Sequence, residues 1–100
     1  MIEYINYIID DNNICHLSIN RPPVNALSFN LLLELKNNLI SLKDKKIRVL
    51  IISTSNNHFS AGADLKERKI MSKKDSGNAL DNFNDCFNIL ENFYSPVICA

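Results

Sequence analysis

One segment, residues 57–68, combines small side chains with the start of a helix, which suits a site that binds negative charge. Residues 60–63 read Ser-Ala-Gly-Ala, so a ligand can approach their backbone closely. The charged run 64–69 predicts a short helix, whose first turn has free N–H groups and the positive end of the helix dipole. Two N–H donors that converge on one oxygen stabilise an oxyanion or enolate, and only one such donor can be assigned here. The alternative is an ordinary strand-to-helix turn with Gly62 at a positive φ.

Other reactive side chains are sparse. His58 and Ser60 could serve as base and nucleophile, but no third group that would orient the imidazole is evident, which disfavours a hydrolase. His16 is expected on the face of a strand rather than in a site. Two glycines are too few for a P-loop or a dinucleotide fingerprint. Because the cysteines are odd in number and widely spaced, we expect no metal site and no disulfide, and we predict three small buried side chains: Cys15, Cys86 and Cys99.

The first half of the chain must position this segment with a hairpin and a helix. Residues 2–9 and 14–19 are β-rich runs separated by Asp-Asp-Asn-Asn, which predicts a β-hairpin. The prolines that follow predict a rigid exposed loop over 20–26. Ser28 suits an N-cap, and a helix is predicted from there to Lys43, because four leucines recur on one face: Leu31, Leu35, Leu39 and Leu42.

The second half adds a strand, a helix and a further strand. Residues 49–52, Val-Leu-Ile-Ile, predict a parallel strand covered on both faces. Residues 97–100 begin another apolar strand after Ser-Pro, which ends the helix before it. The resulting order favours an α/β architecture in which helices cross over between strands. That last helix is predicted from a stripe expected to face the core or a second subunit: Leu80, Phe83, Phe87, Leu90 and Tyr94.

Composition excludes several classes of protein. The 11 basic and 11 acidic residues give zero formal charge, which argues against nucleic acid as the main ligand. Apolar runs are far shorter than the roughly 20 residues that cross a bilayer. The N-terminus shows no features of a secretory signal or a transit peptide. We therefore expect a single cytoplasmic domain without membrane contact.

Three segments, in this order, resemble landmarks of the enoyl-CoA hydratase/isomerase (crotonase) superfamily. They are 20–27 (Asn-Arg-Pro-Pro-Val-Asn-Ala-Leu), 59–67 (Phe-Ser-Ala-Gly-Ala-Asp-Leu-Lys-Glu) and 95–100 (Ser-Pro-Val-Ile-Cys-Ala). The Ala-Gly-Ala-Asp-Leu-Lys part is highly characteristic, and the resemblance runs along the whole chain. Residues 64–68 with Met71 are further similar to the subgroup that contains methylglutaconyl-CoA hydratases.

The resemblance implies a fold, a substrate and a set of site residues. The fold is the ClpP/crotonase spiral of ββα units, of which residues 1–100 would be the truncated N-terminal part with only the first units. The substrate is an acyl-CoA thioester, so coenzyme A is no separate cofactor, and the assembly is a homotrimer or hexamer. Relatives hold the thioester carbonyl between two backbone N–H groups, and the first matches Ala63 here. Positions that match CoA-contacting ones are Asn25, Ala26, Leu27, Ala61, Gly62, Asp64, Leu65 and Lys66.

Some of these assignments have alternatives. The turn 25–27 could serve packing alone, and Lys66, which could approach a CoA phosphate, could instead be a solvated helix residue. The glycine-rich stretch that gives the second donor and the glutamates that deliver water are expected beyond Ala100. The chain alone is therefore predicted to be inactive, and its four glutamates are interpreted as solvated or helix-surface residues: Glu3, Glu34, Glu67 and Glu91.

The leading function is hydration of a 2-enoyl-CoA, with the enolate stabilised in an oxyanion hole. Within the superfamily the alternatives are an isomerase, a dehydratase or a thioester hydrolase. A third class is a non-catalytic CoA-binding or subunit-capping module. RNA binding is another possibility, since some similar hydratases bind RNA through lysines of the first long helix, and the basic residues there are Lys36, Lys43, Lys45, Lys46 and Arg48. Zero net charge disfavours it.

Overall fold

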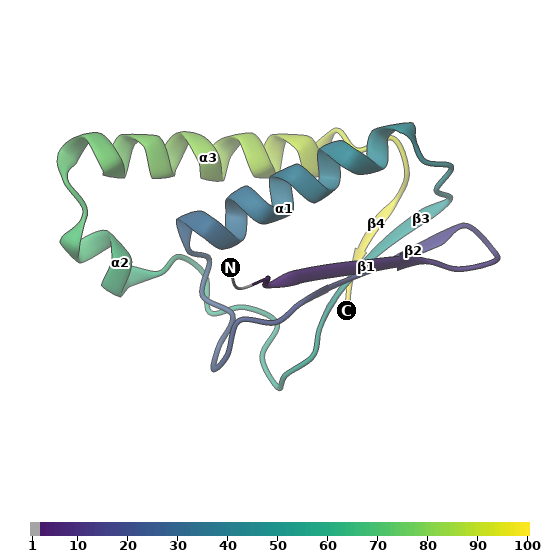
Figure 1. Cartoon of the computed structure of the whole chain (residues 1–100), viewed down its shortest axis with the longest axis horizontal. Coiled ribbons are helices and arrows are strands. Elements are labelled where there is room, and N and C mark those ends of the chain that lie inside the picture. The colour runs from purple at the N-terminus through teal and green to yellow at the C-terminus, as the bar shows by residue number, and fades with distance from the viewer. Residues whose placement is uncertain (1–2) are drawn as a thin grey trace.

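The computed structural model describes residues 3–100, in which a sheet carries helices on one side (Figure 1). The predicted hairpin, crossover helices and strands are all present. Ile2, the predicted first residue of the first strand, lies outside the described residues. The elements are β1 (Ile5–Ile9), β2 (Ile14–Ile19), α1 (Phe29–Ser41), the 3-10 turn η1 (Leu42–Asp44), β3 (Val49–Thr54), α2 (Leu65–Ile70), α3 (Lys73–Glu91) and β4 (Val97–Cys99).

The four strands form one sheet in the order β1-β2-β3-β4. β1 and β2 are antiparallel, whereas β2, β3 and β4 are parallel, so the sequence prediction of a hairpin followed by crossovers is confirmed. The hairpin turn is closed by Asp10, whose Oδ1 accepts the N–H groups of Asn12 and Ile14 at 2.9 and 3.0 Å. Asn13 takes the positive φ of 62° that this turn needs.

The core lies between the sheet and α1. The predicted leucine stripe of α1 is confirmed, because all four of its leucines are buried, and Leu50 and Ile52 of β3 face them in the same core. The prediction that β3 is covered on both faces is wrong. Its alternate residues, Val49 and Ile51, are only half-buried, because both long helices lie on the same side of the sheet (Figure 1).

Helix α3 (Lys73–Glu91) includes residues before the predicted stripe, and only part of that stripe faces the core. Its N-cap is Ser72, whose hydroxyl accepts the N–H of Asp75, and it ends at Glu91. The buried residues are Ala79, Asn82 and Cys86, whereas three members of the predicted stripe are 41–50% exposed: Leu80, Phe87 and Tyr94. Phe83 and Leu90 of the stripe are half-buried and pack against the core, as predicted, whereas packing of the exposed members against a second subunit stays a prediction. On the buried face, Asn82 donates from Nδ2 to the Phe29 carbonyl.

The cysteines behave as small apolar residues in two cases of three. Cys15 and Cys86 are buried and unpaired, and burial raises the pKa of the Cys86 thiol to about 11, which keeps it neutral. Cys99 is exposed, contrary to the prediction, because it lies on the outermost strand of the sheet. Within residues 3–100, no helix combines the length and the apolar character needed to cross a membrane.

Candidate functional site

Two loops, 20–28 after β2 and 55–64 after β3, meet beside the sheet (Figure 1). Because β2 and β3 are parallel neighbours, their carboxyl ends lie at the same edge. Leu27 and Ala63 form a parallel bridge: the Leu27 N–H donates to the Gly62 carbonyl at 2.7 Å, and the Asp64 N–H donates to the Leu27 carbonyl at 3.4 Å. The fold therefore brings together the two loops that contain the predicted site residues, except Leu65 and Lys66, which begin α2 directly after the second loop.

The backbone around Gly62 leaves one donor free. Gly62 has a positive φ of 89°, as expected for the alternative of an ordinary strand-to-helix turn. Three N–H groups near that of Ala63 are occupied: that of Ala61 donates to the Val24 carbonyl at 2.9 Å, that of Gly62 to Ser60 Oγ at 3.0 Å, and that of Asp64 to the Leu27 carbonyl. The Ala63 N–H has no acceptor anywhere in the described residues 3–100. In a parallel bridge the groups of the central residue point away from the partner strand, so this donor faces outward from the loop pair.

The Asn25 side chain holds the two loops together from inside. Asn25 is fully buried, and its backbone has a positive φ of 53°. Its Nδ2 donates to the His58 carbonyl at 2.6 Å and to Asn56 Oδ1 at 3.0 Å, while its Oδ1 accepts the Arg21 N–H at 2.7 Å. The Asn25 side chain therefore serves packing, one of the two roles left open for this turn.

Ser60 is engaged by backbone rather than by histidine. Its hydroxyl donates to the Asn25 carbonyl at 2.8 Å and accepts the Gly62 N–H at 3.0 Å. His58 is exposed, and its N–H group donates to Asn56 Oδ1 at 3.1 Å. A nucleophilic serine needs a base that takes its proton, and the Ser60 proton faces a carbonyl, so the hydrolase alternative gains no support.

Asp64 and Arg21 form an ion pair at the start of α2. Asp64 is the N-cap of α2, and its Oδ1 accepts the Glu67 N–H at 3.0 Å. Its Oδ2 lies 3.0 Å from Arg21 Nη1, which also donates to the Ala26 carbonyl at 3.0 Å. The Arg21 guanidinium lies 5.6 Å from the centroid of the Tyr4 ring. The Glu67 N–H, and after it the Arg21 guanidinium, hold the pKa of the Asp64 carboxyl below its usual value.

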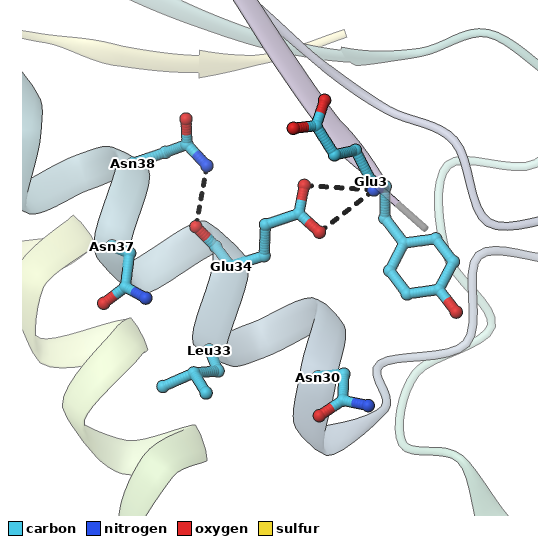
Figure 2. A pocket seen from close by; sticks show the side chains of 7 residues that line it. Glu3, Asn30, Leu33, Glu34, Asn37 and Asn38 are labelled. Carbon is cyan, nitrogen blue, oxygen red and sulfur yellow. Dashed lines mark hydrogen bonds between the residues drawn. The ribbon is translucent and has the colours of Figure 1, made fainter. Parts of the chain in front are cut away.

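Two glutamates interpreted as solvated are in fact bound to backbone. Glu34 projects from α1 toward the start of β1, where its carboxylate accepts the Tyr4 N–H at 3.0 Å and the Ile5 N–H at 2.6 Å (Figure 2). Glu67 Oε1 accepts the Phe29 N–H at 3.0 Å. Both lie on helices, as the second part of the interpretation has it, but they are not solvated, because the first N–H groups of a helix and of an edge strand lack partners and attract a carboxylate. The Glu34 pocket contains none of the predicted site residues.

The remaining predicted residues lie on the outside of the loop pair, where a ligand can reach them. Ala61 and Lys66 are exposed, and Leu65 is 71% exposed. Ala26 and Leu27 are half-buried. No group of three His, Cys, Asp or Glu that could hold a metal occurs within residues 3–100. The site is thus a free backbone donor flanked by an exposed apolar side chain and a cation.

Sequence reasoning missed the residues that hold the loops. The roles of Ser60, Asn56 and Arg21 depend on contacts between loops more than 30 residues apart, or between a loop and a helix cap. Local patterns report neighbours along an element, so they give no signal for such contacts. Small residues before a helix start pointed to the segment 57–68, and only the resemblance pointed to the loop 20–27 as its partner.

Sequence comparison identifies relatives of known type. A sequence model described as enoyl-CoA hydratase/isomerase matches residues 10–100. The chain is 35% identical over 92 residues to a probable enoyl-CoA hydratase of Bacillus subtilis, covering 90% of this chain and 36% of that protein. It is 40% identical over 94 residues to the mitochondrial methylglutaconyl-CoA hydratase of Mus musculus, covering 91% of this chain and 30% of that protein. The chain therefore spans about a third of the length of these relatives.

Solved structures share the fold. The crystal structure of an enoyl-CoA hydratase from Bacillus anthracis matches with a TM-score of 0.87 at 31% identity, over 97% of this chain and 39% of that one. A putative enoyl-CoA hydratase/isomerase (crotonase) from Legionella pneumophila matches with a TM-score of 0.85 at 25% identity, over 99% and 40% of the two chains. The predicted crotonase-like fold, with only part of the spiral present, is thereby confirmed. From the matched residues and the shared fold together, the chain belongs to the enoyl-CoA hydratase/isomerase family.

Proposed function

We propose that this chain is the thioester-polarising part of an enoyl-CoA hydratase-like enzyme. The observation that carries the proposal is the Ala63 N–H, which has no acceptor within residues 3–100 although the N–H groups of both neighbours are occupied. The carbonyl oxygen of an acyl-CoA thioester accepts this N–H. The names of the relatives, enoyl-CoA hydratase and methylglutaconyl-CoA hydratase, support a CoA thioester as the substrate class.

The donor has a clear part in hydration. When the oxygen of water bonds to C3 of a 2-enoyl thioester, the water loses a proton to a base, the electron pair of the double bond moves toward the carbonyl, and negative charge collects on the thioester oxygen. A fixed N–H stabilises that enolate more than the neutral substrate, which lowers the barrier. A proton then adds to C2. In an isomerase, a dehydratase or a thioester hydrolase of this superfamily the same half-site would stabilise the corresponding anion, so those reactions remain the alternative.

The chain supplies only part of this chemistry. Hydration also needs carboxylates that deliver water and a proton. Glu34 and Glu67 are occupied by backbone N–H groups of other elements. We therefore propose that residues 1–100 are the N-terminal part of the catalytic domain and bind an acyl-CoA without turning it over. Detectable hydration of crotonyl-CoA by the purified chain would contradict this part.

The CoA moiety is proposed to run along the outer surface of the two loops. Its contacts are the backbone of residues 25–27 and 61–62, the exposed Leu65 side chain and Lys66, whose ammonium would face a phosphate. Asp64 contributes by holding the loop through Arg21 rather than by contact with CoA. In the whole enzyme we propose a homotrimer or hexamer in the cytoplasm, with no cofactor beyond the CoA of the substrate and no nucleic acid or membrane partner. Lys36, one of the basic residues considered for RNA, is paired with Asp85 at 3.2 Å.

The test compares two ligands that differ only at the carbonyl. Butyryl-CoA has the thioester carbonyl, and S-butyl-CoA has a methylene in place of that carbonyl. Calorimetric titration of the 100-residue chain should show that butyryl-CoA binds about fivefold more tightly, the ratio of dissociation constants that corresponds to the free energy of one hydrogen bond. Ala63→Pro removes the N–H and should abolish this preference, whereas Ala63→Gly keeps the N–H and the preference. A preference that persists in Ala63→Pro would overturn the assignment of Ala63, and circular dichroism controls for folding.

A further inference from the structure

The Ser60 hydroxyl connects the two loops three residues before the free donor of Ala63. It donates to the Asn25 carbonyl at 2.8 Å and accepts the Gly62 N–H at 3.0 Å. Asn25 lies 35 residues away in the sequence and is itself fully buried. The Ser60 side chain is half-buried, so its hydroxyl is an internal part of the loop pair.

Gly62 is the residue whose freedom has to be restricted if the Ala63 N–H is to point in one direction. Glycine has access to more backbone conformations than any other residue, and Gly62 uses the left-handed region with φ of 89°. The peptide unit after Gly62 contains the Gly62 carbonyl and the Ala63 N–H, which point in opposite directions in a trans peptide. The Leu27 N–H holds that carbonyl at 2.7 Å. The hydrogen bond to Leu27 thus fixes the peptide plane that follows Gly62, which is the plane that contains the Ala63 N–H.

The peptide unit before Gly62 is fixed by Ser60. That unit contains the Gly62 N–H, which donates to Ser60 Oγ. With both planes held, neither torsion of Gly62 is free to change without breaking a hydrogen bond. The same bond occupies the neighbouring N–H, so that a carbonyl oxygen arriving at this position meets one available donor, that of Ala63.

We propose that Ser60 is a positioning residue, which orients the Ala63 N–H through Gly62 and keeps the Gly62 N–H from competing for the substrate carbonyl. This inference rests on the proposed function of Ala63. Ser60 does not contact the reacting atoms in this account. Its hydroxyl proton goes to the Asn25 carbonyl, and Asn25 is held in turn by the Arg21 N–H at 2.7 Å and by Asn56.

The first test needs no ligand. Amide hydrogen exchange of the 100-residue chain should show a protected Gly62 N–H and an unprotected Ala63 N–H. Ser60→Ala should speed exchange at Gly62 by about fivefold or more, because one hydrogen bond is lost, and Ser60→Thr, which keeps a hydroxyl, should restore protection. Ser41→Ala is the matched control, because the Ser41 hydroxyl donates to the Asn38 carbonyl far from the loops. An unprotected Gly62 in the wild type overturns the inference.

The second test measures positioning itself. The preference for butyryl-CoA over S-butyl-CoA should fall in Ser60→Ala and return in Ser60→Thr, while the affinity for S-butyl-CoA stays at the wild-type value. If Ser60 had a merely structural role, Ser60→Ala would lower the affinity for both ligands alike. A full preference in Ser60→Ala overturns the inference and leaves the proposed function standing. No preference in the wild type overturns the proposed function, and the positioning role with it, whatever the exchange data show.

Discussion

At the scale of single residues, the ion pair of Arg21 and Asp64 joins the two loops on the outside, as Asn25 does on the inside. The Asp64 carboxylate caps α2 with one oxygen and pairs with Arg21 through the other. Its side chain is 15% exposed and that of Arg21 is 26% exposed, so water screens the pair only in part. The pair therefore stabilises the folded state only while the Asp64 carboxyl is charged.

This charge makes stability depend on pH. The folded-state pKa of Asp64 is lowered, so its contribution is complete above the unfolded value, about 3.9, and is lost as pH falls through the folded pKa. Chemical denaturation should show a free energy of unfolding that decreases below about pH 4. Asp64→Asn keeps a capping side chain but should weaken that decrease. The control Asp85→Asn, in an exposed pair with Lys36, should keep the wild-type decrease. An equal pH dependence in wild type and Asp64→Asn would contradict this role.

Some of the site was predictable from residue types, and some was not. The small residues before a charged helix start predicted free N–H groups in this segment, and the resemblance assigned the donor to Ala63. The positive φ of Gly62 is the feature expected of the alternative, an ordinary strand-to-helix turn. The internal contacts of Ser60 and Asn25 were not predictable. A serine two residues before a glycine has no fixed partner in sequence, since its acceptor is a carbonyl in another loop.

At the scale of elements, two carboxylates tie secondary structures to each other. Glu67 links α2 to the first residue of α1, and Glu34 links α1 to the start of β1 (Figure 2). In each case the carboxylate accepts N–H groups that helix or sheet geometry leaves without a partner. The same links set where β1 and α2 lie relative to α1, the helix that follows the first loop of the site.

The Glu34 link can be tested by stability. Glu34→Ala leaves the Tyr4 and Ile5 N–H groups without their acceptor, which should lower the free energy of unfolding by about 1–3 kcal/mol. Glu34→Gln keeps one acceptor oxygen and should cost less. Glu91→Ala, at the exposed end of α3, is the control and should stay within about 0.5 kcal/mol of wild type. Urea denaturation measures all three. Glu34→Ala that is as stable as Glu91→Ala would show that this contact does not stabilise the fold.

Helix prediction succeeded where one apolar face decided the packing and failed where it did not. The α1 leucines are buried as their spacing predicts. In α3 the buried face contains alanine, asparagine and cysteine, and the larger side chains Phe87 and Leu80 remain exposed. Periodicity weights large apolar residues, so it found the half-buried Phe83 and Leu90 but not the small residues of the buried face. The Tyr94 hydroxyl, beyond the helix, instead lies 2.7 Å from the carbonyl oxygens of Leu42 and Lys45.

At the scale of the whole molecule, the parallel pairing of β2 and β3 is what creates the site. It brings loops that start 35 positions apart, after Ile19 and Thr54, to one edge of the sheet, while α1 and α3 cover one side (Figure 1). The loop contacts occupy the N–H groups of Gly62 and Asp64 and leave that of Ala63, between them, without an acceptor within residues 3–100. The account depends on that donor reaching a thioester carbonyl.

The most direct measurement is the infrared stretching frequency of a ¹³C-labelled thioester carbonyl in crotonyl-CoA bound to the chain. A hydrogen bond to the carbonyl oxygen lowers this frequency, so we expect a shift to lower wavenumber in the wild type. The shift should be lost when the amide between Gly62 and Ala63 is replaced by an ester, which removes the N–H with little change in shape, and kept in Ala63→Gly. The same shift in the ester-containing chain and the wild type, or no shift in the wild type, would contradict the account.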